Sequence, residues 1–310
     1  MIKVKFYGVR GSIATAGDET RRYGGNTSCV AVQAGGETLI FDAGTGIRRL
    51  GADLGAGVAS GGVRAHLFFS HLHWDHIQGF PFFGPAFGPG NRLDVYGVQS
   101  ELDPGGHPQT IEIPMATLSD GPPVADAKGV RAAMAAQMNA PNFPVGLDAM
   151  RADLRFFDVP YGERITLPAS SAPIIVRHVG VDHPNGCVAW RVEHDGHAVV
   201  YATDLELAEG TDGAVFDGLV ELSRGADLLV FDAMYTPEEY EGKGTFSRRG
   251  WGHSTFEMGA ALAEQAKVRS LCLFHHDPNH DDAFMDRLAS RARARFSQTT
   301  IAQEGMELSL

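Results

Sequence analysis

The run HLHWDH at residues 71–76 constrains the fold of this chain more than any other stretch of its sequence. It follows directly after AHLFFS, residues 65–70, a short apolar run that is typical of a fully buried strand. The spacing of His71 and His73 puts both imidazoles on one side of an extended segment, while the aspartate and the last histidine come after a turn. Imidazole and carboxylate are the ligand types that Zn²⁺, Mn²⁺ and Fe prefer over the alkaline earth ions. The run therefore predicts a metal site, with donors for two adjacent ions, at the end of a strand.

The length and composition describe a globular chain. Its 310 residues fit one large domain, or two fused halves that share a core, because domains usually run to about 100–200 residues. The content of 44% hydrophobic and 21% charged residues is ordinary for a globular protein. The 38 glycines indicate many tight turns and therefore a β-rich architecture.

The charge and the cysteines narrow the expected partners and compartment. With 38 acidic against 26 basic residues the net charge is −12, so we expect no large nucleic-acid interface, although a small anionic substrate can still bind at a local cationic centre. The three cysteines are far apart and form no CxxC pair, which argues against a disulfide framework and fits a reducing compartment. No apolar stretch is as long as a membrane span, which needs about 18 residues. No leader is apparent at the start. We therefore expect a cytoplasmic protein without a membrane partner.

Hydrophobic periodicity predicts two β-rich stretches with a few helices, at about 1–150 and 151–310, and hence an α+β fold. Residues 2–7 alternate between apolar and polar, the period of a strand with one buried face. Helices are expected after residue 47, within 124–140, at 281–296, and at 254–265 with a capping box from Ser254 to Glu257. The other expected strands lie at 29–32, 38–41, 65–70, 93–97, 155–159, 174–178, 187–192, 198–202, 228–231 and 271–274.

The segment 103–150 has two interpretations. Residues 103–123 are irregular and rich in proline and glycine, and residues 124–140 carry an Ala/Met-rich helical pattern. Because long loops are often functional, the segment is either a lid over the site or an insertion packed on a sheet edge.

The signature HxHxDH at 71–76 resembles that of the metallo-β-lactamase superfamily. The likeness continues in four blocks, in family order and over nearly the whole chain: LIFDAGTG (39–46), HPNGCVAWRVE (183–193), VVYATD (199–204) and LCLFHHD (271–277). The resemblance implies a single domain, 1–310, built as an αββα four-layer sandwich whose two β-rich halves share one core.

The resemblance also implies two divalent metal ions, Zn²⁺ in the first place, with Mn²⁺ or Fe as alternatives. One ion would be bound by His71, His73 and His183. The other would be bound by Asp75, His76 and a histidine at 275 or 276. Asp204 would bridge both ions. We choose His275, which occupies the position after the apolar strand where the family ligand lies. The implied metal ligands are His71, His73, Asp75, His76, His183, Asp204 and His275.

Each of these assignments has an alternative. His183 could be a turn residue, with His178 or His194 as the ligand instead. Asp204 could be the N-cap of a helix that follows it, a role that aspartate often takes. The residues His276, Asp277 and His280 could instead support the ligands through hydrogen bonds or form a surface turn.

The C-terminal third resembles the phosphodiesterase branch of the superfamily, which includes ribonuclease Z, in the blocks FDAMYTPEEY (231–240) and WGHST (251–255). By that resemblance Asp232 orients His253, which donates a proton to the leaving oxygen, and Asp75 completes the catalytic set. The chemistry requires such a donor, because an alkoxide leaving group needs a general acid. The alternative is that His253 only packs in front of the helix that follows it.

Other blocks resemble a bacterial branch labelled as metal-dependent phosphohydrolases or cyclic-phosphate phosphodiesterases: GVRGS, RYGGNTSC (22–29), the FPFF loop and FHHDPNHDD (274–282). The Gly- and Lys/Arg-rich arm of ribonuclease Z is missing. We therefore expect hydrolysis of a small, including cyclic, phosphodiester by a metal-bridging hydroxide, and a homodimer as the default assembly.

Rival functions share the same ligands. A lactonase or thioesterase would not need Asp232 and His253. A di-iron redox protein would need a flavin module, and this interpretation and a non-catalytic metal-binding or sensor module are both less favoured. Phosphate could also be contacted from the first loops by Arg10, Asn26 and Ser28, and Ser70 could support the ligand loop. The aromatic residues that could line a pocket, or else belong to the core, are Trp74, Phe80, Phe82, Phe83 and Phe87.

Overall fold

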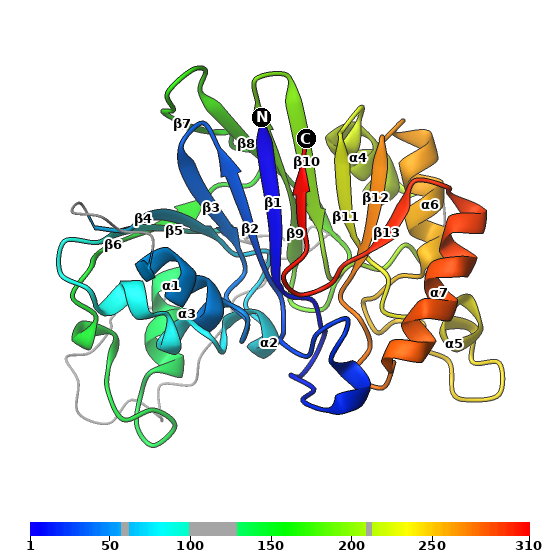
Figure 1. The fold of residues 1–310 in the computed structure, drawn as a ribbon, viewed down its shortest axis with the longest axis horizontal. Coiled ribbons are helices and arrows are strands. Elements are labelled where there is room, and N and C mark those ends of the chain that lie inside the picture. Colours follow the sequence, from blue (N-terminus) through cyan, green and yellow to red (C-terminus); the bar gives the residue numbers. More distant parts are fainter. Residues whose placement is uncertain (57–61, 99–128, 209–212) are drawn as a thin grey trace.

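The computed structural model describes residues 1–56, 62–98, 129–208 and 213–310 (Figure 1). Its strands form two seven-stranded sheets. The first has the order β14-β1-β2-β3-β4-β5-β6 and the second the order β13-β12-β11-β10-β9-β8-β7. The strands of the first sheet are β1 (Ile2–Gly8), β2 (Cys29–Ala34), β3 (Glu37–Phe41), β4 (Arg64–Phe68), β5 (Arg92–Val98), β6 (Asp153–Val159) and β14 (Glu307–Ser309). Those of the second are β7 (Ile165–Leu167), β8 (Ile174–Val181), β9 (Cys187–His194), β10 (His197–Ala202), β11 (Leu228–Asp232), β12 (Ser270–Phe274) and β13 (Thr299–Ile301).

Helices cover the outer faces of both sheets. Figure 1 shows α1 (Ile47–Ala56) and α3 (Val130–Gln137) on one side of the paired sheets, and α4 (Ala214–Ser223), α6 (Phe256–Gln265) and α7 (Asp282–Arg295) on the other. The predicted αββα four-layer sandwich is therefore confirmed. Both chain ends lie in the first sheet, where β14 pairs with β1 in antiparallel register.

The core between the two sheets explains the sequence pattern of the strands. In β1 the alternate residues Ile2, Val4 and Phe6 are fully buried, and the lysines between them face outward. Each such apolar side chain contributes about 1.5–3 kcal/mol when it leaves water. All five residues of β11 are buried, because one face of the strand meets the opposite sheet and the other face meets helices.

Strand direction determines where the site lies. The pairs β3–β4 and β4–β5 are parallel in the first sheet, and β10–β11 and β11–β12 are parallel in the second. The carboxyl ends of parallel strands share one edge of a sheet, and here both such edges contribute loops to the same place. Figure 1 shows the short helix α2 (Trp74–Ile77) there, between the sheets.

Some element boundaries differ from the expected ones. The strand expected at 65–70 ends at Phe68, because the next two residues leave the sheet to begin the ligand loop. The helix expected from Ser254 begins at Phe256 instead, and its N-cap is Thr255, whose side chain accepts from the backbone of Met258. The Ser254 hydroxyl donates to the Leu205 carbonyl at 2.8 Å, so it holds a loop rather than capping the helix.

The lid interpretation falls largely on residues 103–128, which lie outside the described residues. The described helix of that segment, α3, contacts β5 and β6 through buried residues such as Met134. The helix α4 was not expected from the sequence. Among the described residues, no helix has both the length and the apolar character needed to cross a membrane.

Candidate metal centre

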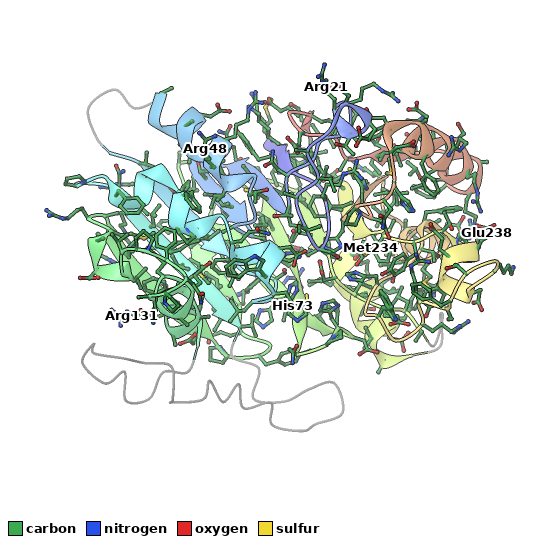
Figure 2. All side chains as sticks on the ribbon, turned by 90° about the horizontal axis from the view of Figure 1, so that it is seen from below. Arg21, Arg48, His73, Arg131, Met234 and Glu238 are labelled. Atoms are coloured by element: carbon green, nitrogen blue, oxygen red, sulfur yellow. The ribbon has the colours of Figure 1, made fainter. Side chains whose placement is uncertain are left out.

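The seven residues expected to bind metal come from both sheets and meet at one end of the sandwich. His71 and His73 lie in the loop after β4, and the next two of the signature lie on α2. Figure 2 shows His73 in the middle of the molecule, between the half that carries Arg48 and Arg131 and the half that carries Met234 and Glu238. The remaining three follow strands of the second sheet: His183 after β8, Asp204 after β10 and His275 after β12.

Three residues that follow strands at this edge have a left-handed backbone. Asp42 has φ +61°, Asp204 has φ +52° and His275 has φ +59°. Non-glycine residues rarely adopt this conformation, which is found at functional sites where the surrounding structure enforces it. Here the sharp turn after each strand places the side chain in the cluster.

The first group of donors is His71, His73 and His183. The Nε2 atom of His183 lies 3.1 Å from Nδ1 of His73, and the three donor atoms lie within 4.8 Å of one another. The Nε2 atom of His71 is buried and has no hydrogen-bond partner among the described residues. A buried imidazole nitrogen without a partner is costly, so this atom fits a metal ligand.

The second group is Asp75, His76 and His275. Oδ2 of Asp75 lies 3.2 Å from Nε2 of His76 and 3.3 Å from Nε2 of His275. The two imidazole nitrogens are themselves 3.3 Å apart. One carboxylate and two imidazoles are again the donor set of a divalent transition metal.

Asp204 lies between the two groups. Its Oδ2 atom is 3.7 Å from Nε2 of both His71 and His183, and its Oδ1 atom is 3.2 Å from Nε2 of both His76 and His275. Each carboxylate oxygen therefore faces one group of donors. This arrangement fits two divalent ions that share one carboxylate.

Burial and the buried carboxylates shift the pKa values of the site histidines in opposite directions. Burial lowers the pKa of His71, and it lowers the pKa of His183 to about 4, so both imidazoles are in the neutral form that binds metal. Burial also opposes the charged form of His76, but the carboxylates of Asp204 and Asp75 outweigh it and raise its pKa.

Asp42 supports the ligand loop and was missed as a site residue in the sequence analysis. Its carboxylate lies 2.8 Å from Nδ1 of His76 and accepts hydrogen bonds from the backbone and hydroxyl of Ser70 and from the Tyr201 hydroxyl, each at 2.8 Å. Such partners fix the orientation of a ligating imidazole. The sequence signal was its position directly after a predicted strand, in the DAGTG turn.

The other expected ligands also have fixed orientations. Nδ1 of His183 lies 2.8 Å from the carbonyl oxygen of Gly252, and the backbone N–H of Ser12 donates to Oδ2 of Asp75 at 2.8 Å. Nδ1 of His71 lies 3.0 Å from the Ser70 hydroxyl. The loops that carry Ser12 and Gly252, far apart in the sequence, thus both contact these side chains.

His253 and Asp232 form a buried pair beside both groups. Nδ1 of His253 lies 2.7 Å from Oδ2 of Asp232. The His253 ring is stacked on His275 with centroids 4.9 Å apart and lies edge-on to His183 at 5.2 Å. Burial disfavours the imidazolium, but the Asp232 charge and hydrogen bond prevail and raise the pKa of His253 to about 9. The pair can therefore hold a proton next to the expected metal ligands.

The alternative ligands lie elsewhere. Nε2 of His276 lies 2.9 Å from the Ala302 carbonyl oxygen, and burial lowers the pKa of this histidine to about 3. His178 accepts a hydrogen bond from Gly162. His194 is on β9 beside Ser171, and no helix begins at Asp204.

The first loops contribute little to a phosphate site. Arg10 is fully buried and donates to the carbonyl oxygens of Gly24, Asp277 and His280 at 2.7–2.9 Å. The Asn26 amide donates to Glu304 at 3.0 Å. Of the aromatic residues, Phe80 and Phe83 belong to the core, and Trp74 and Phe82 are more than half exposed.

Comparison with known proteins agrees with this geometry. A family model described as "Beta-lactamase superfamily domain" matches residues 37–276. The ribonuclease Z of Halorubrum lacusprofundi is 26% identical over 297 residues, which cover 88% of this chain and 86% of that protein. The metallo-β-lactamase fold protein YhfI from Bacillus subtilis superposes with a TM-score of 0.65 at 19% identity over 100% of both chains. The short form of human tRNase Z superposes with a TM-score of 0.59 at 18% identity, over 99% of this chain and 98% of that one.

These relatives correct one expectation from the sequence. The net charge led us to expect no large nucleic-acid interface, and that was wrong, because the chain is similar over most of its length to proteins named ribonuclease Z. Net charge is a sum over the whole surface. It does not describe the potential at the mouth of one site, where metal ions and single arginines dominate.

The family model covers more than half of the chain, and the observed sandwich agrees with it. The chain therefore belongs to the metallo-β-lactamase superfamily.

Proposed function

We propose that this protein is a phosphodiesterase with two divalent metal ions, Zn²⁺ in the first place and Mn²⁺ or Fe as alternatives. The observation that carries the proposal is the buried Asp232–His253 pair, whose imidazole is stacked on His275 beside the donor groups. A diester with an alkoxide leaving group needs a proton donor at this position, whereas a thioester, which releases a much less basic thiolate, does not.

The donors fit the two ions as two sets that share Asp204. One ion would be held by His71, His73 and His183, and the other by Asp75, His76 and His275. When bound, the ions would neutralise charge that develops on the phosphate oxygens and lower the pKa of water.

The protein's own groups then hold the proton and the substrate in place. Asp232 accepts from Nδ1 of His253, so the proton for the leaving oxygen comes from Nε2. Asp232 itself accepts backbone hydrogen bonds from Met234 at 3.0 Å and Leu205 at 3.3 Å, which fix its carboxylate. The Gly252 carbonyl at His183 links the loop of the proton donor to the metal ligands.

The substrate that we propose first is a small phosphodiester, cyclic diesters included. A pocket of about 360 Å³ opens next to His183 and is lined by Asn185, Glu206, Arg249 and Gly252, a volume in the range of small-molecule sites. RNA is the second candidate, because the relatives are named ribonuclease Z. We also propose that residues 1–310 act as one domain, because both halves supply donors to the same centre.

The test combines metal content with hydrolysis of bis(p-nitrophenyl) phosphate. Metal-free protein is loaded with Zn²⁺ or Mn²⁺ and compared with Asp204→Asn and with Asp217→Asn, which removes an exposed carboxylate from α4. Near two ions per chain, with turnover lost only in Asp204→Asn, would support the proposal. Two ions without diester turnover would move the search to lactones and thioesters. A chain that binds no metal would overturn the proposal.

A further inference from the structure

The loop between α5 (Pro237–Glu241) and α6 carries an arginine whose charge is not neutralised. Among the described residues no carboxylate forms an ion pair with Arg248, and its Nη1 atom is buried without a hydrogen-bond partner. The neighbouring Arg249, by contrast, pairs with Glu241. Arg10 also has one buried nitrogen without a partner, Nη2, but its Nε and Nη1 atoms donate to three carbonyl oxygens and its side chain is fully buried away from the surface. A half-buried cation with an unused donor is costly unless it meets an anion.

Arg248 lies one aromatic ring beyond the proposed proton donor. Its guanidinium carbon is 5.1 Å from the centroid of the Tyr235 ring, and that ring lies edge-on to His253 with centroids 5.8 Å apart. The backbone of Tyr235 is held by the carbonyl of Ser254, so the spacing is fixed. Under the proposed function, in which His253 would protonate the leaving oxygen, Arg248 is therefore a candidate contact for the leaving group.

Two exposed aromatic rings belong to the same loop. Phe246 is 60% exposed and Trp251 is 51% exposed, and their ring centroids are 5.5 Å apart at an angle of 33°. Arg248 also lies over Phe246, at 5.1 Å from its centroid. Gly252, which follows Trp251, contacts the proposed ligand His183 through its carbonyl oxygen, so the loop borders the donor groups. Large rings kept in water beside a site are suited to stack on a flat ring of the substrate.

We propose that Arg248, Phe246 and Trp251 form a leaving-group subsite for a nucleotide that carries a further phosphate. The guanidinium would bind the additional phosphate by charge-assisted hydrogen bonds, and the rings would stack on the base. This inference rests on the proposed function, since it takes His253 as the proton donor. It adds a specificity that the metal ligands alone do not supply, because they contact only the scissile phosphate.

The test compares two dinucleotides in the protein with its metals bound. Thymidylyl-thymidine has one phosphodiester, and its form with added 5′- and 3′-terminal phosphates places a further phosphate on the leaving group whichever P–O bond breaks. A charge-assisted contact predicts that the wild type prefers the phosphorylated form by about 10- to 100-fold in kcat/KM, mainly through KM. The variant Arg248→Met should lose this preference while its turnover of bis(p-nitrophenyl) phosphate changes little. Arg248→Lys should keep part of it.

A matched control separates binding from packing. Arg287 also lies over an aromatic ring, 5.5 Å from the centroid of Phe284, on helix α7 and outside this loop. Arg287→Met should keep the preference, and thermal denaturation of both methionine variants reports whether either fails to fold. For the rings, Phe246→Ala and Trp251→Ala should raise KM for thymidylyl-thymidine by about 5- to 100-fold, as expected for a lost base stack.

The outcomes separate this inference from the proposed function. If the wild type hydrolyses bis(p-nitrophenyl) phosphate but does not prefer the phosphorylated dinucleotide, or if Arg248→Met keeps the preference, the subsite is overturned and the phosphodiesterase stands. If no diester is hydrolysed, the proposed function fails, and calorimetric binding of thymidine 3′,5′-bisphosphate decides the subsite. Weaker binding by Arg248→Met than by Arg287→Met would support it, and equal binding would overturn it.

Discussion

Nδ1 of His253 lies 2.7 Å from Oδ2 of Asp232, and both side chains are buried. The contact fixes one tautomer of the imidazole and leaves Nε2 free to face a substrate. A histidine that served only to pack in front of α6 would not require a fully buried carboxylate at this distance. The pair is therefore the part of the site with the sharpest consequences for the chemistry.

His253→Ala should keep its metal ions and lose turnover in a way that depends on the leaving group. For a cyclic nucleotide, whose leaving group is an alkoxide, we expect kcat to fall by about 10²–10⁴-fold, the usual contribution of a general acid. For bis(p-nitrophenyl) phosphate the loss should be much smaller, because p-nitrophenolate leaves without a proton. Kinetics on both substrates and metal analysis check this, with His197→Ala on the β9–β10 hairpin as control. Equal losses on both substrates would contradict the role as acid.

Asp232→Asn should move the alkaline limb of the pH–rate profile to lower pH. The Asp232 charge raises the pKa of His253, against the effect of burial, so its removal lowers that pKa. A general acid must be protonated, and the rate therefore falls as pH rises through its pKa. The profile of kcat for a cyclic nucleotide measures this shift, with Asp217→Asn as the charge-matched control. An unchanged limb would show that another group titrates.

Much of this site could be predicted from the sequence, because its strongest signals are local. The spacing of His71 and His73, and the position of Asp204 and His275 directly after apolar strands, do not depend on tertiary contacts. The sequence blocks also follow the order found in the family, and this order assigned ligands to one site although they lie about 200 residues apart in the chain. The structure brings all seven predicted donors together.

The remaining features depend on contacts that a sequence does not carry. Asp42 was missed because its role exists only where His76 and Tyr201 meet it from other elements. Arg248 was not singled out because the sequence RRG does not show which of the two neighbouring arginines forms an ion pair with a carboxylate. The Ser254 cap was wrong because the Leu205 carbonyl competes for the hydroxyl.

Asp42→Asn should weaken binding of the ion held by His76. The carboxylate accepts from Nδ1 of His76, and loss of such a partner lowers metal affinity by about 10- to 100-fold. Tyr201→Phe removes one hydrogen bond to the same carboxylate and leaves its charge, so its effect should be smaller. Competition with a chromophoric chelator measures both affinities. Equal affinities in Asp42→Asn and the wild type would contradict the supporting role.

His275→Ala and His276→Ala should differ in metal content. His275 faces Asp75 and Asp204, so its loss should remove one ion per chain. His276 lies 2.9 Å from the Ala302 carbonyl in the core, and its loss should leave the ions but lower the free energy of unfolding by about 1–3 kcal/mol. Metal analysis and denaturant unfolding separate the two. Loss of an ion in His276→Ala would exchange their roles.

Removal of the metal ions should lower the unfolding temperature. Burial and the charge of Asp204 both disfavour the charged form of Asp75, although the imidazoles of His76 and His275 outweigh them and lower its pKa. Bound cations would compensate these buried negative charges more strongly than imidazoles do. Ions bound only by the folded state stabilise it by about 4 kcal/mol at a concentration 1,000 times Kd. For a chain of this size that corresponds to a shift of roughly 5–10 °C.

Differential scanning calorimetry with a chelator, and after Zn²⁺ is added back, measures this shift. The variant Asp204→Asn serves as the internal comparison, because it keeps six of the seven donors but loses the carboxylate shared by both groups. Its metal-dependent shift should therefore be smaller than that of the wild type, whereas Asp217→Asn should keep the full shift. If the wild type unfolds at the same temperature with and without its ions, the donor groups are not a metal centre, since binding to the folded state alone must raise stability.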